Sequence, residues 1–377
     1  MLALCPSRIL APSGFETDRC LLIKDGRIVD LMPLADCPPN ASPEFLEGDL
    51  VPGFIDLQVN GGGGVLFNDQ PTIEGVEAIG RAHRAFGTTG FLPTLISDEL
   101  DVVDQAMRAV EGAIATGVPG VLGIHIEGPF INPDKRGIHD ADKIRKIDET
   151  AVELLASLSN GVTLVTLAPE LAPAGITTAL AKRSVIVAAG HTAASYEEAR
   201  RGLDDGVTGF THLFNAMSQL TGRAPGAVGA ALESDAWCSI IVDGFHVHPA
   251  SLRIALAAKG PDKLVLVTDA MPTVGSDRTT FMLGDRLIRV DNGRCVAEDG
   301  TLAGSNLDMG SAVANAAEAL QVDQAAAIRM ASLNPARALG LQHATGAISP
   351  GLRADLALLN VDGRVLRTWI SDVANEG

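Results

Sequence analysis

Short apolar runs alternate with helical periodicity through the middle of this chain. Runs of five to eight mostly apolar residues recur, and segments such as 72–86 and 195–206 between them space apolar residues three to four apart. Apolar strands joined by helical crossovers predict parallel pairing, and eight such units close a (β/α)8 TIM-type barrel. The expected strands cover residues 53–59, 90–96, 121–127, 162–168, 185–191, 209–213, 239–244 and 263–269.

Both ends of the chain, and one internal segment, have a different pattern. The ends contain short apolar stretches around Asp-Gly turns, and a segment near 278–305 holds Gly-Asp, Asn-Gly and Asp-Gly turns between short strands. Such dipeptides are typical of hairpins. We therefore expect a small β-sandwich domain from residues 1–50 and 342–377. The barrel domain would span 51–341 and carry a β insertion.

Composition and charge narrow the class of partner. Hydrophobic residues make up 46% of the 377 residues, enough for a large core, and the formal net charge is −17. That charge repels nucleic acid and anionic membranes, so an anionic small substrate would need a local basic pocket. The five cysteines include no C-x-x-C pair, and the N-terminus does not resemble a signal peptide. Both features favour the cytoplasm.

Four of the expected strands carry an ionisable residue at or next to their last position: Glu127, His191, His212 and Asp269. Each residue alone is better explained as a core or loop residue. Together they predict an active site, because the C-terminal ends of barrel strands meet at one rim. A carboxylate and two imidazoles can hold a catalytic metal ion that activates water, and Asp269 would move the proton. His125 lies deeper, and we expect a hydrogen-bonded core histidine there.

The motifs along the chain resemble the amidohydrolase superfamily, and within it the single-metal N-acetylglucosamine-6-phosphate deacetylases. The resembling segments include PGFIDLQVNGGGG, HIEGPFIN, AGHTAA, THLFNAMSQLTGRAPG, VTDAMP and GTLAGSNLDM, followed by GLRADLALLN near the end. The resemblance implies hydrolysis of N-acetyl-D-glucosamine 6-phosphate to D-glucosamine 6-phosphate and acetate. The product would enter amino-sugar catabolism and cell-wall recycling.

The first expected strand departs from the pattern of most superfamily members. They carry H-x-H there and hold a second metal, whereas this chain has Gln58 and Asn60. Amide oxygens suit harder ions than zinc, and the single-metal deacetylases have the same substitution. We therefore expect one divalent metal per subunit. Zinc is the first choice, and Fe²⁺, Co²⁺ and Mn²⁺ are alternatives.

The resemblance also assigns roles residue by residue. Glu127, His191 and His212 become the metal ligands, Asp269 the general acid/base, and His139 a group that polarises the acetamide carbonyl. The arginine in T-G-R-x-P-G would reach across a homodimer into the partner's site and hold the phosphate. The substrate-binding set implied is Ile138, Asn215, Ala216, Arg223, His246, Leu302, Ala303 and Gly304.

Three alternatives remain open at this point. The substrate could be the galactosamine epimer, which differs only at the C4 hydroxyl. A two-metal dihydroorotase or aminoacylase is disfavoured by Gln58 and Asn60. A non-catalytic binding barrel is disfavoured by the intact Glu-His-His-Asp set.

Overall fold

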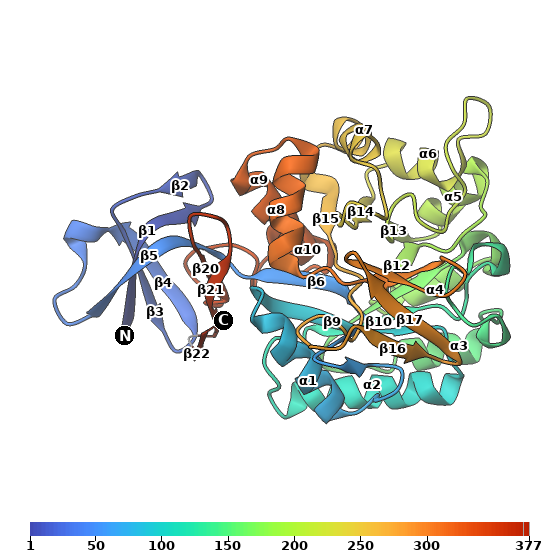
Figure 1. The fold of residues 1–377 in the computed structure, drawn as a ribbon, viewed down its shortest axis with the longest axis horizontal. Coiled ribbons are helices and arrows are strands. Elements are labelled where there is room, and N and C mark those ends of the chain that lie inside the picture. The colour runs from blue at the N-terminus through green and yellow to red at the C-terminus, as the bar shows by residue number, and fades with distance from the viewer. Residues whose placement is uncertain (372, 377) are drawn as a thin grey trace.

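A computed structural model, which describes residues 1–371 and 373–376, contains an eight-stranded parallel barrel (Figure 1). All residues of its first three strands are buried, as expected for parallel strands covered on both faces. The expected fold class is confirmed. Around the barrel the strands are β6 (Phe54–Val59), β9 (Thr88–Ile96), β10 (Gly123–Glu127), β11 (Val162–Leu167), β12 (Ile186–Ala189), β13 (Val207–Phe210), β14 (Trp237–Ile240) and β15 (Leu264–Leu266).

The first and eighth strands close the barrel just beyond the end of β15. A parallel bridge joins Val59 to Ala270. The backbone N–H of Asp269 donates to the carbonyl of Gln58 over 3.0 Å, and that of Asn60 donates to Ala270 over 2.9 Å. This closure brings residues from opposite ends of the barrel sequence together at its C-terminal rim.

Helices connect the strands and cover the outside of the barrel (Figure 1). Several of them begin at a capping side chain: the Thr72 hydroxyl accepts from Gly75 N at the first helix, and Ser195 forms a capping box with Glu198 at the fifth. The helices are α1 (Ile73–Arg84), α2 (Leu100–Ala115), α3 (Glu149–Leu155), α4 (Ile176–Lys182), α5 (Tyr196–Asp204), α6 (Gly226–Glu233), α7 (Pro249–Lys259), α8 (Met309–Leu320), α9 (Gln324–Ala331) and α10 (Leu333–Ala338). None of the helices in the described ranges is long and apolar enough to cross a bilayer.

Strands from both ends of the chain pair in a second sheet beside the barrel (Figure 1). The N-terminal strand β5 lies between β1, which it pairs in parallel, and the C-terminal strand β20, which it pairs antiparallel. The division of the chain into domains 1–50 with 342–377 and 51–341 stays a prediction. The strands of this sheet are β1 (Leu2–Ala11), β2 (Gly14–Glu16), β3 (Arg19–Lys24), β4 (Arg27–Pro33), β5 (Ser42–Pro52), β20 (Leu356–Leu359), β21 (Val365–Ile370) and β22 (Val373–Glu376).

A four-stranded antiparallel sheet stands at the mouth of the barrel, where the sequence pattern indicates a β insertion. Its strands are β16 (Thr280–Leu283), β17 (Arg286–Asp291), β18 (Arg294–Val296) and β19 (Leu302–Ser305), and a short hairpin, β7 (Gly61–Gly62) with β8 (Val65–Leu66), lies nearby. Apolar residues of the insertion, such as Ile288 and Ala303, pack against Ile96 and Met271 of the barrel. The insertion therefore forms one wall above the strand ends.

Candidate active site

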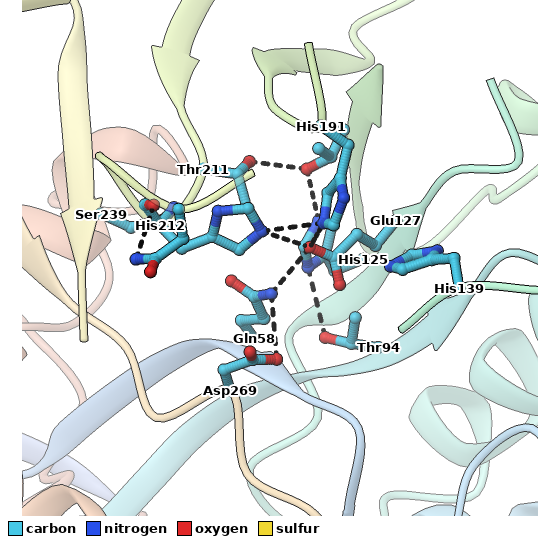
Figure 2. A network of polar contacts seen from close by, with 12 residues as sticks. Gln58, Thr94, His125, Glu127, His139, His191, Thr211, His212, Ser239 and Asp269 are labelled. Atoms are coloured by element: carbon cyan, nitrogen blue, oxygen red, sulfur yellow. Dashed lines mark hydrogen bonds and ion pairs between the residues drawn. The ribbon is translucent and has the colours of Figure 1, made fainter. Parts of the chain in front are cut away.

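Three side chains at the ends of β10, β12 and β13 bring their ligand atoms together. Nε2 of His212 lies 2.9 Å from Oε1 of Glu127 and 3.0 Å from Nε2 of His191, and the His191–Glu127 distance is 3.3 Å. Tetrahedral zinc with ligands at about 2.0–2.1 Å would separate them by about 3.3 Å. The three atoms (Figure 2) are therefore spaced as around one small cation.

The backbone is strained where these side chains enter the site. His191, His212 and Asp269 have φ of 47°, 34° and 54°, a left-handed conformation that costs non-glycine residues about 1–3 kcal/mol each. The strand ladders β12, β13 and β15 have ended before these positions. The turns aim the three side chains at the barrel axis, and such strain is concentrated at functional sites.

The electrostatics of the site favour an ionised carboxylate. Burial alone would raise the pKa of Glu127, but the imidazoles of His191 and His212 hold it well below its usual range. His191 donates through Nδ1 to the carbonyl of Lys135 over 2.8 Å, which leaves Nε2 free as a ligand atom. Nδ1 of His212 is buried without a hydrogen-bond partner. The donor set fits a divalent cation. The lone pairs of two facing imidazole nitrogens and the charge of a carboxylate repel one another, and a cation between them removes this repulsion.

The first strand contributes amide donors to the site. Nε2 of Gln58 donates to Oε1 of Glu127 over 2.9 Å and to Oδ1 of Asp269 over 3.1 Å. Nδ2 of Asn60 donates to the same Oδ1 over 2.6 Å. Both NH2 groups therefore donate to carboxylates, and the absence of a second metal at this pair stays a prediction.

Asp269 is poised to exchange a proton. Burial, reinforced by the negative charge of Glu127, raises its pKa to about 6. Its Oδ1 carries both amide hydrogen bonds, so Oδ2 is the oxygen left for a reacting group. A carboxylate with a pKa near neutrality suits general acid/base chemistry.

His139 adds a neutral imidazole on the other side of the site. Burial, with His191 nearby, lowers its pKa to about 3. Its Nδ1 accepts from the backbone N–H of Ser97 over 3.3 Å, so the ring proton sits on Nε2. Glu127, His139 and His191 also form a buried group whose ligand atoms lie within 4.8 Å of one another and could hold a metal. The tighter spacing of the His212 set favours His212 over His139 as a ligand.

A cavity of about 350 Å³ opens above these groups. It is lined by residues of most strand ends and by Thr301 and Leu302 of the insertion. Most residues implied by the resemblance line it together: Glu127, Ile138, His139, His191, His212, Asn215, Ala216, His246, Asp269, Leu302 and Gly304.

Two residues of the expected set lie elsewhere. Ala303 is fully buried in the apolar cluster beneath the insertion, because its neighbours Leu302 and Gly304 take the cavity-facing positions. Arg223 is exposed on the long loop between β13 and α6, which stands out from the barrel (Figure 1), and it does not line this cavity. Among the described residues that line the cavity there is no arginine.

Several groups in the cavity or directly behind it escaped sequence reasoning. Asp243 holds His246 through a 2.6 Å contact between Oδ2 and Nδ1. The i,i+3 spacing of an acid and a histidine in DGFHV was the available signal. Ile241 and Met271 add apolar walls, with no signal beyond their place after strands. His125 is confirmed as a core histidine, since it is 1% exposed and its ring contacts Thr94 and Thr166.

The chain is similar in sequence and fold to characterised proteins. A model of the amidohydrolase family matches residues 50–374. An N-acetylgalactosamine-6-phosphate deacetylase of Shewanella sp. (strain ANA-3) is 42% identical, covering 95% of this chain and 92% of its own length. An N-acetylglucosamine-6-phosphate deacetylase of Haemophilus influenzae is 36% identical, covering 93% of each. The crystal structure of N-acetylglucosamine-6-phosphate deacetylase from Pasteurella multocida matches with a TM-score of 0.96, 32% identity and full coverage of both chains.

Proposed function

The chain belongs to the amidohydrolase family, and from this premise we propose that it hydrolyses N-acetyl-D-glucosamine 6-phosphate to D-glucosamine 6-phosphate and acetate. The observation that carries the proposal is the convergence of Glu127, His191, His212 and Asp269 on one cavity. Relatives named for this deacetylation match nearly the whole chain. The enzyme would act in the cytoplasm, in amino-sugar catabolism and cell-wall recycling.

One divalent cation, with zinc as first choice, would be held by Glu127, His191 and His212. When bound, such a cation lowers the pKa of water and polarises the acetamide carbonyl. The separations of 2.9–3.3 Å between the three ligand atoms support this assignment over one that includes His139.

Proton movement would be the task of Asp269. Its free Oδ2 accepts the proton of the attacking water and later gives it to the departing sugar nitrogen. The amides of Gln58 and Asn60 hold Oδ1 and so fix the orientation of the carboxylate. His139 donates from Nε2 to the acetamide oxygen, where negative charge grows in the transition state.

The sugar phosphate needs positive charge that this chain's own cavity barely supplies. Asn215, the backbone of Ala216 and His246 would contact the phosphate, and Ile138, Leu302 and Gly304 the sugar. Lys135 and His246 are the only basic side chains that line the cavity besides the histidines near the ligand set, among described residues. We assign the missing cation to the partner subunit's Arg223 in a homodimer, because residues 219–224 are exposed and Arg223 does not line the cavity of its own chain.

The galactosamine epimer is a second candidate substrate. It is favoured by the 42% identity to the Shewanella protein, which exceeds the 36% identity to the Haemophilus one. The two substrates differ only in the orientation of the C4 hydroxyl. The relative kcat/KM values on the two epimers decide between them.

Acetate release provides the direct test. The purified enzyme is assayed with both 6-phosphorylated epimers and with free N-acetyl-D-glucosamine, and its metal content is measured in the same sample. We expect rapid release from N-acetyl-D-glucosamine 6-phosphate and weak release from the free sugar. Higher kcat/KM on the galactosamine epimer would transfer the function to the second candidate. No release from either phosphorylated sugar by metal-loaded protein would refute both.

A further inference from the structure

Three cysteines gather in the second sheet, away from the candidate active site. Cys5 lies on β1 and Cys20 on β3, and the antiparallel register that pairs Leu4 with Leu21 puts these two cysteines opposite each other. Cys37 follows the short 3-10 helix η1 (Leu34–Asp36) in the connection between β4 and β5. All three belong to one small apolar cluster. None of them has a task in the proposed reaction.

Cys5 forms hydrogen bonds with both of the other thiols, and the contact between Cys20 and Cys37 is the one that can become a bond. The Sγ atoms of Cys20 and Cys37 are 3.2 Å apart, and both cysteines are free. A disulfide needs an S–S distance of about 2.05 Å, so the two sulfur atoms must approach by roughly 1.2 Å. Cys20 is held within β3 between β1 and β4, whereas Cys37 sits in a connection and is followed by Pro38. The movement therefore falls to Cys37.

Exposure differs between the two thiols in a way that suits oxidation. Cys37 is partly exposed, so a dissolved oxidant can reach it. Cys20 and Cys5 are buried, at 0% and 4% exposure. An external reagent therefore meets Cys37 first, and Cys20 is the thiol in contact with it.

We propose that Cys20 and Cys37 form a reversible disulfide when the protein meets a low-molecular-weight disulfide such as glutathione disulfide. The Cys37 thiolate attacks one sulfur of the reagent, forming a mixed disulfide and releasing one glutathione. The Cys20 thiolate then attacks Sγ of Cys37 and releases the second glutathione. In sum, two protein thiols and one glutathione disulfide become one protein disulfide and two glutathione molecules.

The second step sets the rate of the exchange. Burial, strengthened by hydrogen bonds with Cys37 and Cys5, raises the pKa of the Cys20 thiol well above its ordinary value. Little thiolate is therefore present at neutral pH, and the bond forms slowly there and faster in alkaline solution. A slow reaction is compatible with thiols that stay reduced in the ordinary cytoplasm and respond to sustained oxidation.

Native oxidation followed by peptide mapping tests the proposal on the wild-type protein. The full chain is incubated with glutathione disulfide across a range of pH, denatured in the presence of an alkylating reagent and digested with trypsin. Cleavage after lysine and arginine puts Cys5, Cys20 and Cys37 in separate peptides, 1–8, 20–24 and 28–81. We expect the free thiols to fall from five to three, a cross-link between peptides 20–24 and 28–81, and reversal by dithiothreitol.

Cysteine variants separate this bond from other reactions. Cys37→Ser should keep all four of its remaining thiols, while Cys5→Ser and the matched control Cys238→Ser, buried in the barrel, should each lose two of four. Five free thiols after oxidation of the folded wild type, a persistent glutathione adduct on Cys37, or a cross-link to peptide 1–8 would each overturn the proposal. Because the mapping uses wild-type protein, it stands even where a variant fails to fold.

Discussion

The side-chain amide of Asn60 donates a 2.6 Å hydrogen bond to Oδ1 of Asp269, joining the first and last strands of the barrel at its rim. Gln58 donates to the same oxygen. Two NH2 groups, one from each residue of the first strand, therefore face this carboxylate oxygen. These two donors fix the orientation of the carboxylate and direct the positive ends of their N–H dipoles at it.

Replacement of Asn60 by leucine tests this support. The side chain keeps its approximate volume but loses the donor, and a hydrogen bond to a charged group contributes about 1.5–3 kcal/mol. We expect kcat to fall roughly ten- to a hundredfold with KM little changed, since the role proposed for Asp269 is proton transfer to and from the reacting atoms. The control Asn160→Leu removes an amide hydrogen bond to the backbone carbonyl of Glu111 outside the active cavity and should retain kcat. Equal kcat values in the two variants would contradict the role given to Asn60.

Replacement of Asp269 by asparagine should abolish turnover and leave the metal and substrate bound. The amide has the same size but cannot accept the proton, and loss of a general base typically costs about 10²–10⁴-fold in rate. Steady-state kinetics, metal analysis and substrate titration of the variant check each part. Activity within tenfold of wild type would assign the base elsewhere, with His139 as the next candidate.

Metal analysis should find one equivalent per subunit. Protein purified without chelator should contain close to one metal ion per subunit, and removal of this metal by a chelator should abolish activity. One added equivalent of zinc should restore it. Glu127→Gln should lower the affinity for zinc, because a neutral amide replaces the only anionic ligand of the set. Two equivalents bound at the barrel mouth would refute the single-metal assignment.

Arg223→Ala should raise KM for the phosphorylated sugar and leave the weak activity on the free sugar nearly unchanged. Loss of this charge-assisted contact should raise KM for the phosphorylated sugar roughly ten- to a hundredfold. The exposed Arg200→Ala serves as a control. Co-expression of Arg223→Ala with Asp269→Asn tests sharing between subunits, because a heterodimer would contain one site with both groups intact. Absence of recovered activity in a sample that contains the heterodimer would place Arg223 outside the partner's site.

Asp56 should make folding stability depend on pH. Burial raises its pKa to about 7, so between pH 4 and 7 the folded state holds a proton that the unfolded state has lost. The contribution of this group to the free energy of unfolding is therefore present at low pH and declines as pH rises, by at most about 1.4 kcal/mol per unit. Asp56→Asn removes this decline, and denaturant titrations of both proteins from pH 4 to 8 measure it. If the free energy of unfolding changed with pH in the same way in both proteins, the pKa of Asp56 would not be raised as stated.

The alternation of apolar and polar positions was enough to predict the barrel and its rim. Strand side chains repeat every two residues, and parallel strands end on one side, so Glu127, His191, His212 and Asp269 could be expected to converge before any contact was known. The resemblance of the motifs then supplied roles for His139 and the cavity residues. These inferences depend on local periodicity and motif spacing, and both can be read directly from the amino-acid sequence.

Tertiary structure alone decided which distant groups touch. Asn60 and Asp269 are 209 residues apart, and only closure of the barrel between Val59 and Ala270 turns two apparent non-ligands into donors for the carboxylate. The 3.2 Å contact of Cys20 with Cys37 likewise depends on where a connection folds over a strand. Such contacts depend on strand register and on the paths of loops, and neither is encoded in the period of any single segment.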